Sequence, residues 1–173
     1  MNDLAVPAPT ISPDMEALVA AAERGGLKDM QVAVTPDGVA HLLIPGLFGR
    51  DLIAIVSLDG SYLRAEVPNI QVAGRAATAP DVAAVEWQLI RTVALLDFHH
   101  RGPGRLGLDS DGEVRAIVVL PMGAPVDAVL RLAFAELTKV LTAFDELWPG
   151  PGRIISDPAA TPFGPIPGGN RPN

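Results

Sequence analysis

The sequence predicts an α+β domain with an antiparallel β-sheet of about five to six strands and three helices. Helical periodicity marks three segments, near residues 12–26, 81–98 and 125–148. Alternating apolar and polar residues occupy 30–67 and 105–120. Asp-Gly pairs interrupt these alternating runs, as is typical of tight turns between antiparallel strands. The expected order is therefore helix, β-meander, helix, β-hairpin and helix.

The first helix has clear signals at both ends. Ser12 is a favourable N-cap residue, Pro13 suits the first helical position, and Gly25 and Gly26 end the periodic run. The side chains that recur every three or four residues form one apolar face, which we expect to lie on another element: Met15, Leu18, Val19 and Ala22.

The segment 30–67 predicts a β-meander with turns at Asp37-Gly38 and Asp59-Gly60. We expect type I′ turns, which require positive φ at both central positions. Both faces of the strand at 52–56 are apolar, which predicts a central strand covered on both sides by helices or by another subunit. Its residues Ile53 and Ile55 are therefore a candidate partner-binding strand surface. Residues 70–72 could add a short edge strand.

The second helix carries two apolar stripes, and one sheet face cannot cover both. The first stripe consists of Val82, Val85, Leu89, Val93 and Leu96. The second consists of Trp87, Ile90, Ala94 and Phe98. The second stripe could pack against the long final helix, or it could form a self-complementary patch across a two-fold axis. We favour the latter and predict that it is a dimer or partner interface.

The domain is expected to span residues 12–148. Residues 1–11 contain prolines without periodicity and predict a flexible lead. Residues 149–173 are so rich in proline and glycine that we expect a disordered tail. This tail contains the spacing PxxP between Pro162 and Pro165, so it could also be a ligand for a groove that accepts polyproline segments.

Composition excludes several classes of site. Acidic residues exceed basic ones by seven, which disfavours direct binding to nucleic acid or to an anionic membrane. The absence of cysteine excludes disulfides and thiolate metal sites. There is neither an apolar run long enough to span a bilayer nor a signal-like start, so we expect a cytoplasmic protein. The excess of arginine over lysine and the abundant alanine indicate a GC-rich bacterial genome.

No catalytic motif is found, and we predict no catalytic residues, no metal site, no cofactor and no enzymatic activity. His99 and His100 could ligate a metal, but adjacent helical residues point about 100° apart, so a polar helix end is the better interpretation. Residues 109–113 begin like a calcium loop, but the later carboxylate is missing, which favours a plain hairpin turn. A catalytic cluster using His41 would require assembly in space.

The passage ALLDFHHRGPGRLGLDSDGEVRAIVVLPM, followed by an amphipathic helix, resembles the YbjN-like proteins. The resemblance covers about residues 12–148 and implies the fold of the type III secretion chaperones. It further implies a homodimeric, non-enzymatic protein that binds segments of another protein in a chaperone-like or regulatory role. The alternative is a sensor of small molecules with a cavity between the sheet and the helices.

Overall fold

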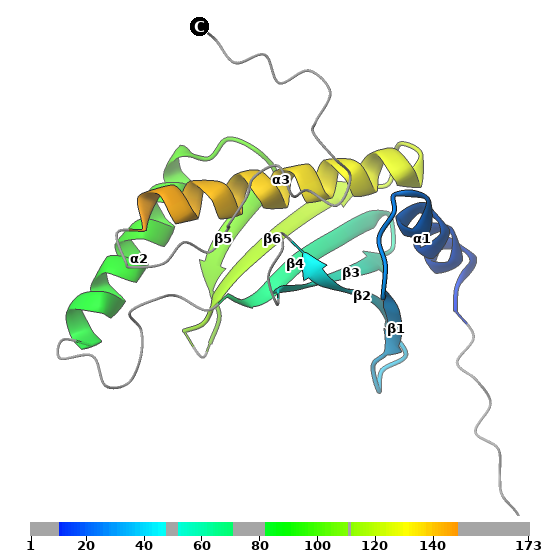
Figure 1. Cartoon of the computed structure of the whole chain (residues 1–173), viewed down its shortest axis with the longest axis horizontal. Helices are drawn as coiled ribbons and strands as arrows, with labels where there is room; N and C mark the ends of the chain where they lie inside the picture. The colour runs from blue at the N-terminus through cyan, green and yellow to red at the C-terminus, as the bar shows by residue number, and fades with distance from the viewer. Residues whose placement is uncertain (1–10, 48–51, 71–81, 111, 149–173) are drawn as a thin grey trace, which may run out of the picture.

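The computed structural model describes residues 11–47, 52–70, 82–110 and 112–148, and these form an α+β domain (Figure 1). The predicted fold class is confirmed. In chain order the elements are α1 (Pro13–Arg24), β1 (Gln31–Val34), β2 (Ala40–Leu47), β3 (Leu52–Asp59), β4 (Tyr62–Ile70), α2 (Val82–His99), β5 (Gly104–Leu108), β6 (Val114–Pro121) and α3 (Val126–Leu147). The predicted lead and tail lie outside the described residues, except for Ile11.

The six strands form one sheet in the order β1-β2-β3-β4-β6-β5, and all neighbouring strands are antiparallel. The first four strands are neighbours in both sequence and space, as a meander requires. The β5–β6 hairpin then adds to β4 through its second strand, so β5 becomes an edge. Helix α2 comes between β4 and β5 in the chain and packs beside β5.

The predicted turns occur at the Asp-Gly pairs, but their expected backbone conformation was wrong. In the turns at Asp37-Gly38 and Asp59-Gly60 only the glycines have positive φ, 85° at Gly38 and 56° at Gly60. Asp59 is the last residue of β3 and pairs with Tyr62, so the loop begins at Gly60. At the first turn, the N–H of Gly38 donates to the carbonyl of Thr35 at 2.9 Å, which makes a wider turn with one left-handed residue.

Residues 70–72 were considered as a possible separate edge strand, but the first of them belongs to β4. Ile70 is the last residue of β4 and pairs with Val114 of β6, inside the sheet. The register shifts between Val67 and Ile70, where Asn69 has a φ of 53°. This irregularity keeps Ile70 fully buried. Residues 71 and 72 lie outside the described ranges.

The helices cover one face of the sheet. Helix α3 packs on β4, β5 and β6, while α1 packs on α3 and β3. Alternate strand residues such as Leu63, Ala65 and Val67 are fully buried together with Leu137 and Phe144 of α3. The layer between sheet and helices is thus filled with side chains, and none of the described helices covers the opposite face, which we call the open face. Coverage of β3 on both sides, by helices or by another subunit, was expected; the described helices cover one side, and coverage of the other side by another subunit stays a prediction.

Helix α1 is fixed at both ends. The N–H of Met15 donates to the hydroxyl of Ser12 at 3.2 Å, which confirms the predicted N-cap. At the other end, Arg24 donates two hydrogen bonds of 3.0 Å to Asp127 of α3. The hydrogen bond from Arg24 holds the pKa of Asp127 below its usual value. The stability that this pair contributes is therefore present above the usual carboxyl pKa and is lost as the pH falls through the lowered value.

Candidate functional site

The predicted interface stripe on α2 points into solvent. Trp87 is 68% exposed, Phe98 is 82% exposed and Ile90 is 46% exposed. Ala94 lies between them and is exposed as well. The spacing of these four residues by three or four positions places them along one side of the helix. The structure therefore brings together all four residues of the predicted stripe.

The opposite side of α2 anchors the helix to the domain. Leu89, Thr92, Val93 and Leu96 are buried, and α2 packs against β5 and α3. The predicted first stripe thus faces the core at Leu89, Val93 and Leu96. Its other two members, Val82 and Val85, have side chains that the structure does not describe. The alternative in which the second stripe packs against α3 does not hold, because those side chains are exposed. The exposed stripe is carried by a helix that is itself held in place.

The link from α2 to β5 packs tightly on α3. The carboxylate of Glu136 is buried; one of its oxygens accepts a hydrogen bond from Lys139, and the other lies 3.5 Å from Nε2 of His100. A side chain at Gly102 would clash with this carboxylate and with the ring of His100. His99 instead packs edge-on against Phe98, with ring centroids 5.1 Å apart. The two adjacent histidines therefore have different neighbours and do not face the same site.

The turn at residues 109–113 has the hydrogen bonds of a hairpin. The N–H of Glu113 donates to Oδ1 of Asp109 at 2.9 Å, and Nη2 of Arg115 donates to Oδ2 at 3.2 Å. Both carboxylate oxygens of Asp109 thus stabilise the turn and the start of β6. This geometry favours the hairpin interpretation over the calcium loop; Asp111 lies outside the described residues.

The open face of the sheet is the second candidate surface. Ile53 of β3 is 47% exposed there, and Ile55, the other residue of the predicted strand surface, is half-buried on the same face. Val119 of β6 and Tyr62 of β4 are also exposed. Both residues of the predicted partner-binding strand surface therefore lie on a face that no helix of the described chain covers.

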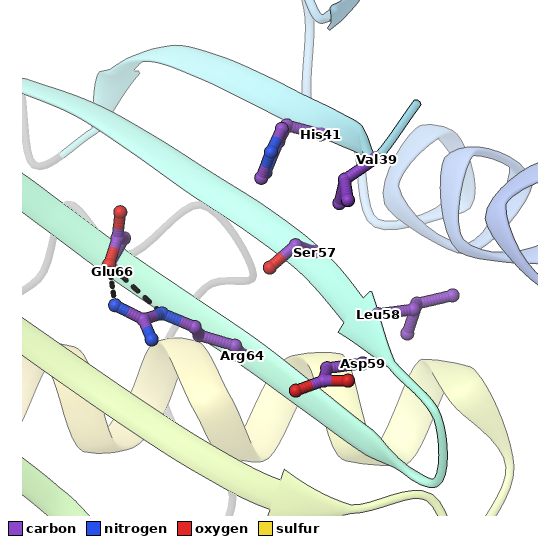
Figure 2. A pocket seen from close by; sticks show the side chains of 7 residues that line it. All are labelled: Val39, His41, Ser57, Leu58, Asp59, Arg64 and Glu66. Carbon is purple, nitrogen blue, oxygen red and sulfur yellow. Dashed lines mark hydrogen bonds and ion pairs between the residues drawn. The ribbon is translucent and has the colours of Figure 1, made fainter. Parts of the chain in front are cut away.

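A polar hollow of about 430 Å³ lies on this open face (Figure 2). It is lined by Val39, His41, Ser57, Leu58, Asp59, Arg64 and Glu66. In Figure 2 the side chains come from β2, β3 and β4, apart from Val39, which directly precedes β2, and α3 passes behind these strands. The register explains the grouping, because His41 pairs with Ser57 and Ser57 pairs with Arg64 across adjacent strands.

Charged side chains on the open face form ion pairs with one another. Nε and Nη2 of Arg64 donate to Oε2 of Glu66 at 3.1 and 2.7 Å. Arg115 lies between Glu66, at 4.0 Å, and Asp109, at 3.2 Å. The side chains of Glu66 and Asp109 are only 15% exposed. These charges are thus set into the face, between the apolar side chains.

The hollow was not predicted from the sequence. The sequence analysis expected His41 in a strand, and the structure places it in β2. Its neighbours on the adjacent strands depend on the pairing register, which cannot be read from the sequence. The available signal was the polar pair Ser57 and Asp59, which follows Ile53 and Ile55 on the same face of β3. Where the residues on one face of a strand change from apolar to polar, the surroundings of that face change as well.

Comparisons with known protein families and curated proteins identified no related protein. No model of a known protein family matches the chain, and no curated protein matches it. Within the described ranges, none of the three helices is both long and apolar enough to cross a membrane. The likeness to YbjN-like proteins therefore stays a prediction from the sequence.

Proposed function

We propose that this chain is a non-enzymatic, homodimeric protein-binding module that acts in the cytoplasm. It would bind a segment of a partner protein, in the chaperone-like or regulatory manner implied by the YbjN-like resemblance. The observation that supports this proposal most is the exposed stripe of Trp87, Ile90, Ala94 and Phe98 on an anchored helix. Side chains of this size and exposure are typical of surfaces that bury themselves against another protein.

The stripe suits a two-fold axis. A helix packed against its own copy buries the same residues twice, so few side chains are needed. Burying each large apolar side chain contributes about 1.5–3 kcal/mol, and aromatic pairs add to this. Trp87 and Phe98 lie toward opposite ends of the stripe, so an antiparallel copy would place the Trp87 end of one subunit near the Phe98 end of the other.

Replacing Trp87 and Ile90 by glutamate should convert the dimer into monomers, because charged side chains cannot be buried in that interface without partners. Sedimentation velocity ultracentrifugation measures this directly. The matched control replaces Gln88 and Leu95, which are exposed on the neighbouring side of the same helix, by glutamate and should leave the dimer intact. An unchanged dimer in the Trp87→Glu, Ile90→Glu variant would contradict the interface assignment.

The partner segment is proposed to lie on the open sheet face at Ile53 and Ile55. Ile53→Glu should abolish capture of a stoichiometric partner from native lysate, because it places a charge among exposed apolar side chains. Leu132→Glu is the control, since Leu132 is 48% exposed on the helix side of the domain. Capture by full-length protein and by a chain ending at Trp148 should be equal. Loss of capture on truncation would instead favour the proline-rich tail as the binding element.

Small-molecule sensing is a second candidate function, and the hollow beside His41 and Ser57 favours it. The cavity was expected between the sheet and the helices, but buried side chains fill that layer. This candidate function therefore rests on the hollow of the open face instead. Both candidate functions, binding of a protein segment and sensing of a small molecule, would thus use the open face. A free ligand would compete with a bound segment there.

A further inference from the structure

A charged residue lies in the middle of the exposed side of α2. Arg91 follows Trp87 by four positions and precedes Ala94 by three, and Phe98 comes four positions after Ala94. This spacing places the four side chains along the same side of the helix, and all four are exposed. No ion pair or hydrogen bond joins Arg91 to another residue in the described part of the chain. Arg91 is not part of the predicted stripe and has no role in the proposed function so far.

The spacing of these residues allows two ways of packing α2 on its own copy, and both obey a two-fold axis. Helix α2 lies at one end of the domain, beside β5, where a second copy can approach it (Figure 1). In a parallel pair each residue faces itself, so Arg91 faces Arg91 of the partner subunit. In an antiparallel pair, Trp87 lies opposite Phe98 of the partner subunit. The same midpoint then places Arg91 opposite Ala94 of the partner subunit.

The parallel pair brings two like charges together at the centre of the interface. A guanidinium does not lose its proton in proteins, so the charge of Arg91 cannot be removed by a change of pH. Asp97, on the same helix, lies 3.4 Å from Nε of Arg105 and already has a cationic neighbour. Like charges that face each other across an interface lower the affinity of the two partners. The position of Arg91 therefore disfavours the parallel pair.

The antiparallel pair provides space and a favourable contact for Arg91. Ala94 has the smallest side chain of the four, so it leaves room for the stem of Arg91 of the partner subunit. Long side chains in helices lean toward the N-terminus, which directs the guanidinium to the Trp87 end of its own helix. Phe98 of the partner subunit lies at that end, and a guanidinium over an aromatic ring is favourable. Each end of the interface then contains one tryptophan, one phenylalanine and one arginine.

We propose that Arg91 makes the α2 dimer antiparallel, with Arg91 of each subunit packed against Ala94 and Phe98 of the partner subunit. A single polar residue at the centre of a helix–helix interface fixes how the helices align, and it costs some affinity. This inference rests on the proposed function and deepens it, because it states how the second copy binds and which residue decides the orientation. The occupant of the exposed side of α2 is a second copy of this chain.

Disulfide cross-linking tests the orientation, since the chain contains no cysteine of its own. Full-length Trp87→Cys and Phe98→Cys chains are mixed in equal amounts in a glutathione redox buffer, and mass spectrometry identifies the products. The mixed disulfide should exceed both self-linked products together, because it joins two positions that face each other. It also leaves one tryptophan–phenylalanine pair intact at the other end of the interface. Self-linked Phe98→Cys in excess of the mixed product would overturn the inference.

Removing the charge tests the role of Arg91 itself. With Arg91→Leu in both cysteine chains, the self-linked share of Phe98→Cys should rise at least about fivefold, because the like charges that disfavour the parallel pair are gone. Arg131→Leu is the matched control, since it removes the same group from an exposed position on α3 and should leave that share unchanged. An unchanged share in the Arg91→Leu chains would show that Arg91 does not set the orientation.

Sedimentation velocity of the unaltered chain, at the concentration of the cross-linking experiment, separates this inference from the proposed function. A dimer whose cysteine variants give mainly self-linked products keeps the proposed function and overturns the antiparallel orientation. A dimer whose variants give neither product has its interface away from α2, which overturns the inference and the interface assignment but not the dimer. A chain that sediments as a monomer overturns both the inference and the proposed homodimer.

Discussion

Replacing Leu137 by alanine should lower the free energy of unfolding by about 2–5 kcal/mol, the cost of a cavity in a packed core. Leu137 is fully buried on α3, the helix that packs on β4, β5 and β6. The loss combines the transfer free energy of the removed carbons with the contacts that surrounding side chains can no longer make. Chemical denaturation at constant protein concentration measures it.

The same substitution at Leu132 provides the control for Leu137. Leu132 lies on the same helix, has the same helical propensity and is 48% exposed. Leu132→Ala should therefore change the free energy of unfolding by less than about 0.5 kcal/mol. Similar losses at the two positions would mean that the orientation of α3 on the sheet is wrong.

A methyl group added at Gly104 should destabilise the domain by about 1–3 kcal/mol, as overpacking does in well-packed interiors. A Cβ at this position would lie 2.6 Å from Cγ2 of Val140 and 3.3 Å from the carbonyl oxygen of Glu136. Valine is stiff at χ1, and the carbonyl belongs to helix α3, so neither neighbour can move away easily. Strand β5 would have to shift from α3. Thermal and chemical unfolding of Gly104→Ala measure the effect.

Gly107, on the same strand, is the matched control for Gly104. A Cβ there meets no atom within 4 Å. Alanine at Gly107 should leave stability unchanged or raise it by up to about 1 kcal/mol, because glycine loses more backbone entropy on folding. Destabilisation of equal size at both glycines would show that the close approach of β5 to α3 is not the cause.

The order of helices and strands was predictable because short sequence signals mark where each element begins and ends. Ser12 and Pro13 mark the start of α1, and periodicity divides the apolar residues of α2 into two stripes, one with Leu89 and one with Trp87. Each of these signals depends on residues within one turn of the chain. The structure agrees with the predicted order, and the amphipathic α3 lies on the sheet with its apolar side buried.

Features that depend on pairing between strands were not predictable to the same degree. The turns were located correctly, yet their conformation depends on which residue ends the strand, as Asp59 shows. Ile70 joined β4 because Val114 is available to pair with it. The hollow needed the register of β2, β3 and β4 together, since His41, Ser57 and Arg64 are distant in sequence. Such contacts are set by the whole sheet and leave little trace in any local pattern.

The position of α3 has a consequence for how the chain folds during synthesis. This helix is last among the described elements, yet it packs on three strands and on both other helices. The hairpins of the meander can form early from near neighbours, but the apolar side of β4 has no helix on it until α3 has left the ribosome. Until then, the nascent chain exposes the surface around Leu63 and Ala65 to aggregation. Completion of the fold is therefore expected to be a single late step, and slowing translation before Val126 would lengthen the vulnerable period.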